Sequence, residues 1–111
     1  MNDCVFCNIV KREIQSEILH ETDNLIVIRD IMPKAPVHLL VITKEHIPSV
    51  TDLKPDHRDL LGELILEAKQ IAQQQNIAQS GYKLSFNVGR DGGQVIPHLH
   101  LHIMGGKHLG E

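Results

Sequence analysis

Three histidines stand at every second position near the C-terminus: His98, His100 and His102, with aliphatic residues between them. This alternation of polar and apolar residues predicts a strand that packs one face on the core. Residues two apart share a strand face, so neighbouring imidazole rings would stand about 6–7 Å apart. Imidazole acts as nucleophile, acid, base or metal ligand near neutral pH. The sequence therefore predicts one sheet face that carries a chemically active row.

Three interpretations of this row can be weighed from the residues alone. The histidines could decorate a solvated face, or all three could bind one metal ion, although a catalytic zinc keeps a coordination position open. They could instead act on a phosphate. The glycine-rich segment Gly92-Gly93-Gln94 favours this third interpretation, because its backbone N–H groups can approach an anion closely. A histidine beside such a nest could attack phosphorus and carry a covalent intermediate.

The elements that position this row are predicted from the rest of the chain. We expect an α+β fold with an antiparallel sheet of about five strands, one short helix and one long helix. The apolar stripe from Leu60 to Ala72, preceded by Pro55, predicts the long helix. The last two strands are expected to form a hairpin around the turn 89–94. The other expected elements are a short helix over 4–10 and strands over 17–20, 25–29, 38–43 and 82–87, with an irregular proline-containing stretch over 30–36.

Length and charge narrow the class of protein. At 111 residues the chain is expected to form a single domain, 1–111. Its net charge of −3 argues against a nucleic-acid partner and against an anionic membrane surface. No apolar run approaches the ~20 residues of a membrane span. The start of the chain, Met1-Asn2-Asp3-Cys4, lacks the features of a signal peptide, which predicts a cytoplasmic protein whose cysteines are reduced or bind metal.

Four segments in the same order resemble the histidine triad superfamily of nucleotidyl hydrolases and transferases. The segment from His98 to Met104 matches its His-φ-His-φ-His-φ-φ signature, where φ is apolar. The other three are the Cys-x-Phe-Cys start at Cys4–Cys7, the stretch 29–38, and Gly92-Gly93-Gln94. Gly105-Gly106 is similar to the nucleoside-phosphoramidate hydrolase (Hint) branch rather than to the dinucleoside-polyphosphate branch.

The resemblance implies a role for each histidine of the row. His100 would be the nucleophile that attacks the α-phosphorus and becomes nucleotidylated, and His102 would hydrogen-bond the nonbridging phosphate oxygens. His98 would lie near the leaving group, linked to His38 on an adjacent strand as a proton relay. On the residues alone, His38 could equally be a surface histidine at a strand end.

The resemblance also implies residues that bind the nucleotide. Asp30 would contact the ribose hydroxyls, although beside Pro33 it could simply organise a turn. Asn87 and the backbone around Gly93 and Gln94 would complete the phosphate pocket. The apolar slot for the base would consist of Phe6, Ile9, Ile28 and Ile31, all of which are residue types that also fill ordinary cores.

A structural zinc is a separate question. Cys4 and Cys7 supply half of a zinc site. The resemblance implies that His46 and His98 would complete it. His98 would then have two competing roles, as a zinc ligand and as part of the proton relay. The alternative is two reduced cysteines in a short helix. His57 carries no role and is expected to be solvated.

Together these implications predict a hydrolase that releases a nucleoside monophosphate from purine nucleoside 5′-phosphoramidates through a nucleotidyl-histidine intermediate. No cofactor is required for this chemistry, and the chain is expected to form a homodimer. The alternatives are a nucleotide-binding regulatory protein with little turnover and a dinucleoside polyphosphate hydrolase. Val95 departs from the branch, which usually has a serine there, and removes one hydrogen-bond donor to the phosphate or the scissile nitrogen.

Overall fold

The computed structural model describes residues 4–111 and confirms the predicted α+β architecture. Met1, Asn2 and Asp3, on which the expected absence of a signal peptide partly rested, lie outside the described residues. All strand pairings are antiparallel, and the strand order across the sheet is β1-β2-β3-β5-β4. The elements are α1 (Val5–Val10), β1 (Ile18–Glu21), β2 (Leu25–Arg29), β3 (Val37–Thr43), two short 3-10 turns (Val50–Asp52 and Pro55–His57), α2 (Arg58–Gln74), β4 (Tyr82–Ser85) and β5 (His100–Gly105).

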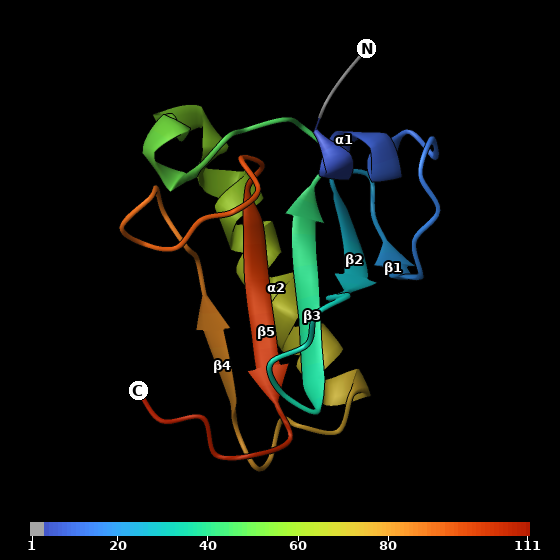
Figure 1. Cartoon of the computed structure of the whole chain (residues 1–111), viewed down its shortest axis with the longest axis vertical. Coiled ribbons are helices and arrows are strands. Elements are labelled where there is room, and N and C mark those ends of the chain that lie inside the picture. The colour runs from blue at the N-terminus through green and yellow to red at the C-terminus, as the bar shows by residue number, and fades with distance from the viewer. Residues whose placement is uncertain (1–3) are drawn as a thin grey trace.

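Helix α2 covers one face of the sheet (Figure 1). Its predicted apolar stripe buries Leu64, Ala68 and Ile71 against alternate residues of the central strands, such as Leu39 and Leu101. This packing gives the sheet its main core, because alternate strand residues point to the same face. None of the helices in the part of the chain described is long and apolar enough to span a bilayer.

The opposite face of the sheet carries the chemistry. Helix α1 packs Phe6 and Ile9 over one part of this face, in a second apolar cluster that includes Ile28 of β2. In Figure 1, α1 lies at the end of the sheet where β3 finishes. The register pairs His100 with Ile42 and His102 with Leu40, so both histidines belong to this second face.

Two predicted elements are shorter than expected. The strand expected over 82–87 ends at Ser85, and the histidine strand begins only at His100. His98 therefore precedes the strand. The reason is a tertiary contact, because the Leu99 N–H donates to the Ile47 carbonyl (2.7 Å) and draws this segment toward the turn after β3.

Candidate active site

A backbone carbonyl fixes the protonation of the His100 ring. Its Nδ1 lies 2.6 Å from the carbonyl oxygen of His98. A carbonyl can only accept, so Nδ1 carries the proton and the neutral ring presents the lone pair of Nε2. The ring of Phe6 packs edge-on against His100, with 5.0 Å between centroids. His100 is thereby held as a nucleophile with one reactive nitrogen.

A chain of hydrogen bonds fixes the His102 ring in the same way. The N–H of Lys34 donates to Nδ1 of His38 (3.0 Å), so the neutral His38 ring carries its proton on Nε2. This Nε2 lies 2.9 Å from Nδ1 of His102 and donates to it. The neutral His102 ring must then carry its own proton on Nε2. His102 is therefore a hydrogen-bond donor beside the lone pair of His100, and the two ring centroids are 5.0 Å apart.

Asp30 completes this chain. Its Oδ2 lies 3.3 Å from Nε2 of His38, and its Oδ1 accepts from the N–H of Met32 (2.8 Å). Asp30 thus contacts the histidine relay and also organises the turn after β2, so the two interpretations weighed for it are compatible.

The predicted link between His38 and His98 is wrong. Nε2 of His98 bonds the carbonyl of Thr43, at the opposite end of β3 from His38. Thr43 lies five residues after His38 along the strand, a separation of about 16 Å. His38 instead contacts His102 and Asp30. The residues that orient these rings, Lys34 through its N–H and Thr43 through its carbonyl, carry no sequence signal because backbone groups are common to all residues.

Burial keeps these imidazoles neutral. It lowers the pKa of His102 to about 4, and the neighbouring His100 and His38 add to the effect. Burial is also the main reason that the pKa values of His38, His98 and His100 lie below the ordinary 6.5. At pH 7 the row therefore offers lone pairs and N–H donors rather than imidazolium charge.

The four residues suggested for zinc converge on one point. Nδ1 of His98 lies 3.2 Å from Sγ of Cys4, 3.4 Å from Sγ of Cys7 and 3.2 Å from Nδ1 of His46, and Sγ of Cys7 lies 3.1 Å from Nδ1 of His46. A tetrahedral zinc with ordinary bond lengths places sulfur and nitrogen ligands about 3.5 Å apart and two nitrogens about 3.3 Å apart. The donor set therefore fits zinc in both type and spacing.

The His98 ring is also in the tautomer that a metal needs. Its Nε2 lies 2.6 Å from the carbonyl of Thr43 and must donate to it, which leaves the lone pair of Nδ1 facing the two sulfurs. The side chain of His98 is fully buried in this position. Of the two roles weighed for His98, the geometry supports that of a zinc ligand, since the ring lies in the cysteine cluster and does not contact His38.

Asp30, His38 and His102 also place one donor atom each within 4.8 Å of the others. In this second cluster, His38 is not in the tautomer that could bind a metal ion. Nδ1 of His38 already accepts the Lys34 N–H, so its Nε2 carries a proton and cannot offer a lone pair. The cluster is therefore a proton-bearing hydrogen-bond network.

The backbone N–H groups of Gly93 and Gln94 do not form the expected anion nest, because both donate to carbonyls of the loop itself. The N–H of Gly93 donates to the carbonyl of Arg90, and that of Gln94 donates to the carbonyl of Gly89 (both 3.0 Å). The Asn87 side chain donates to the carbonyl of Gly92 (2.8 Å). The side-chain Nε2 of Gln94 donates to the carbonyl oxygen of Pro48 (2.7 Å). These hydrogen bonds lie within the loop or tie it to Pro48, so they hold the loop in shape.

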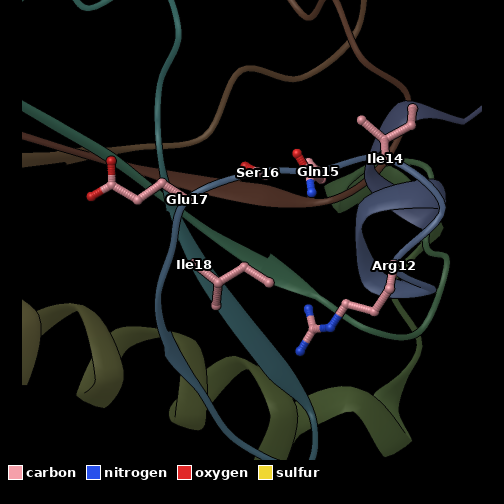
Figure 2. A pocket seen from close by; sticks show the side chains of 6 residues that line it. All are labelled: Arg12, Ile14, Gln15, Ser16, Glu17 and Ile18. Atoms are coloured by element: carbon pink, nitrogen blue, oxygen red, sulfur yellow. The ribbon is translucent and has the colours of Figure 1, made fainter.

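The residues predicted for the base slot are brought together only in part. Phe6, Ile9 and Ile28 share one buried cluster, whereas Ile31 is 92% exposed and does not join it. Ile31 follows the Asp30 turn, which carries it away from the sheet. A cavity of about 640 Å³ borders the cluster at Ile18, in a region where the sequence named no site. Figure 2 shows its lining, with Arg12 pointing toward Ile18; the lining residues are Arg12, Ile14, Gln15, Ser16, Glu17 and Ile18.

His57 is more buried than expected. Only 14% of its side chain is exposed, and Nε2 lies 3.1 Å from a carboxylate oxygen of Glu45. Its Nδ1 accepts from the N–H of Lys54 (3.0 Å), a contact that caps the turn before α2. The expectation of a solvated histidine is therefore wrong, because the turn before the helix needs an acceptor.

Comparison with known proteins bears directly on this site. A family model described as "Scavenger mRNA decapping enzyme C-term binding" matches residues 3–111. A purine nucleoside phosphoramidase of Escherichia coli K12 is 43% identical over 108 residues, which cover 97% of this chain and 91% of that protein. Protein HitA of Neisseria gonorrhoeae is 40% identical over 105 residues, covering 95% and 97%.

Solved structures agree with the sequence relatives. A HIT family hydrolase of Legionella pneumophila superposes with a TM-score of 0.95 at 41% identity, covering 97% of this chain and 96% of that one. A HIT family hydrolase of Clostridium thermocellum gives a TM-score of 0.96 at 41% identity, covering 100% and 96%.

Proposed function

Because this chain belongs to the histidine triad family and is a histidine triad hydrolase, we propose that it cleaves purine nucleoside 5′-phosphoramidates. The products would be a nucleoside monophosphate and an amine. The observation that supports this most is the 2.6 Å contact between the His98 carbonyl and Nδ1 of His100, which leaves one nucleophilic nitrogen beside the N–H of His102. The E. coli relative named purine nucleoside phosphoramidase supports the substrate class.

The reaction would proceed in two displacements at phosphorus. In the first, Nε2 of His100 bonds to the α-phosphorus and the P–N bond breaks, while the departing amine takes up a proton from solvent. In the second, water attacks phosphorus, the bond to His100 breaks and the proton of the attacking water passes to solvent. Two displacements through a covalent intermediate replace one difficult step. The N–H of His102 would stabilise the charge that builds on the nonbridging oxygens.

The remaining residues would bind the nucleotide. Asp30 would accept from the ribose hydroxyls, and Phe6, Ile9 and Ile28 would contact the base beside the cavity shown in Figure 2. Ile31 would form the open rim of the site. The loop that contains Asn87, Gly93 and Gln94 would border the phosphate through its shape, which its internal hydrogen bonds maintain.

The direct test follows AMP release from adenosine 5′-phosphoramidate without added divalent metal. We expect turnover by the wild type and a loss of about a thousandfold or more in His100→Ala, because no other group can replace a nucleophile. His108→Ala, at an exposed position outside the site, is the matched control and should keep full activity. A wild type that binds AMP without turnover would support a regulatory nucleotide-binding protein. Preferential cleavage of dinucleoside polyphosphates would support that alternative substrate.

Cys4, Cys7, His46 and His98 would hold a structural zinc, which ties α1 to the turn after β3. The proposed reaction itself needs no cofactor, since its nucleophile and its donor are both histidines. Elemental analysis of protein purified without added metal should find one zinc per chain. A cluster built on reduced thiols fits a cytoplasmic location.

Strand β4 forms one edge of the sheet, and a second copy could pair with it to form the proposed homodimer. Light scattering should then give about twice the 12.5 kDa mass of one chain.

A further inference from the structure

One residue joins the cysteine cluster to the nucleophile. The side chain of His98 lies among Cys4, Cys7 and His46, while its carbonyl accepts the proton of His100 Nδ1. We propose that His98 is a positioning residue, through which zinc in this cluster fixes the orientation of His100. This inference rests on the nucleophile and the zinc site of the proposed function.

The His98 ring is one of two anchors of its segment, the other being the hydrogen bond from the Leu99 N–H to the Ile47 carbonyl (2.7 Å). His98 lies outside β5, and the backbone hydrogen bond that joins its segment to β3 is a long one, from the Thr43 N–H to the Leu99 carbonyl (3.5 Å). By contrast, Nε2 of His98 bonds the Thr43 carbonyl at 2.6 Å, and Nδ1 lies 3.2 to 3.4 Å from three donors of the cluster. The carbonyl of His98 is therefore placed jointly by the position of its own ring and by the Leu99–Ile47 hydrogen bond, which holds the same planar peptide unit.

Helix α1 supplies a second link to the same nucleophile. Cys4 caps this helix and Cys7 lies within it. Between them, the ring of Phe6 packs edge-on against both His98 and His100, with centroids 5.8 and 5.0 Å away. A bond from each cysteine to a common ion would hold the Phe6 ring against His100. The helix is only six residues long, so it gains little stability from its own backbone.

Without an ion, weak hydrogen bonds hold the cluster together. The lone pair of His98 Nδ1 can accept from the thiols of Cys4 and Cys7, which are weak donors, and the fourth member, His46, is exposed. Loss of the ion would loosen His98 and Phe6 together. Asp30 and His102 lie further along the sheet face and do not depend on this anchor. Loss of zinc should therefore lower kcat more than it raises KM.

The test uses His46→Gln, because His46 is the exposed ligand and its replacement spares the core. His20→Gln is the matched control, since His20 pairs with Glu67 of α2, away from the cluster. Zinc content, kcat and KM are measured for both variants and the wild type. The tautomer of His100 is followed by ¹⁵N nuclear magnetic resonance in zinc-loaded and zinc-depleted wild type. Cys7→Ser provides a second variant should His46→Gln retain zinc.

We expect zinc-depleted wild type and His46→Gln to show a loss of kcat of about tenfold with KM within about twofold, and exchange broadening of the His100 Nδ1–H signal. His20→Gln should match the wild type. An unchanged Nδ1–H signal and kcat after zinc removal would overturn the inference, as would a wild type that binds no zinc. A wild type without phosphoramidase turnover would overturn the proposed function alone, because the tautomer measurement needs no substrate.

Discussion

Proton positions in the histidine row are set by backbone groups, directly for His98 and His100 and through the side chain of His38 for His102. The carbonyls of Thr43 and His98 each accept from one ring, and the N–H of Lys34 donates to a third. These three contacts decide which nitrogen attacks, which nitrogen binds metal and which ring donates. Residue types in the sequence indicate that histidine chemistry takes place here. The assignment of a role to each ring needs the fold.

Asp30→Asn separates the charge of Asp30 from its place in the turn. The asparagine oxygen can still accept the Met32 N–H, so we expect an unchanged fold. Burial lowers the pKa of His100, and the charge of Asp30 opposes that effect. Without the charge, the pKa falls further and the acid side of the kcat/KM profile moves to lower pH. Loss of a charged contact to the ribose should also lower kcat/KM about ten- to a hundredfold.

The measurement for this variant is kcat/KM from pH 4.5 to 8 with adenosine 5′-phosphoramidate. Asp23→Asn, in the exposed turn before β2, is the control for loss of one negative charge. An acid limb that stays in place in Asp30→Asn would mean that Asp30 does not influence His100.

At the level of elements, the sequence predicts the faces of strands better than their ends. The bounds of β2 coincide with the predicted strand over 25–29, and those of β3 begin one residue before the predicted 38–43. Alternating residues reveal which side chains share a face. They do not reveal where pairing starts, which for β5 depends on the contact between Leu99 and Ile47. The expected row of three histidines on one strand is therefore a row of two, with His98 turned into the cysteine cluster.

Two glycines that look alike in the sequence should respond oppositely to alanine. A Cβ on Gly92 would overlap the backbone of Val88, so the loop would have to open; we expect a loss of about 1–3 kcal/mol. Gly62 lies in α2 with open space around it, and alanine there should add about 0.5–1 kcal/mol. Urea unfolding of both variants measures the two changes. Equal effects would show that the packing of the 88–95 loop does not constrain Gly92.

At the scale of the whole molecule, the sheet separates stability from chemistry. Helix α2 and the apolar cluster beneath it stabilise one face. The other face carries α1 over one part and the half-buried side chains of His100 and His102 over another. The strand order places β3 and β5 next to each other inside the sheet, away from both edges. The site is thus built on strands that are paired on both sides, which suits groups that must hold a fixed geometry.

The same burial should make the stability of the protein depend on pH. Four histidines, His38, His98, His100 and His102, have pKa values below 6.5 in the folded protein, chiefly because they are buried. In the unfolded chain these histidines have their ordinary pKa values, so below pH 6.5 the unfolded chain binds protons that the folded protein does not bind. Stability is therefore complete above about pH 7 and falls as the pH drops toward the value of about 4 for His102.

Each extra proton on the unfolded chain corresponds to a slope of about 1.4 kcal/mol per pH unit. Urea midpoints of the zinc-free protein between pH 7.5 and 5 measure this slope while most carboxyl groups stay ionised. His102→Asn removes one of the four groups and should flatten the slope, whereas His108→Asn, at an exposed position, should not. A midpoint that is constant over this range would mean that the folded and unfolded chains bind the same number of protons, and that the histidine face is open enough for its rings to be solvated.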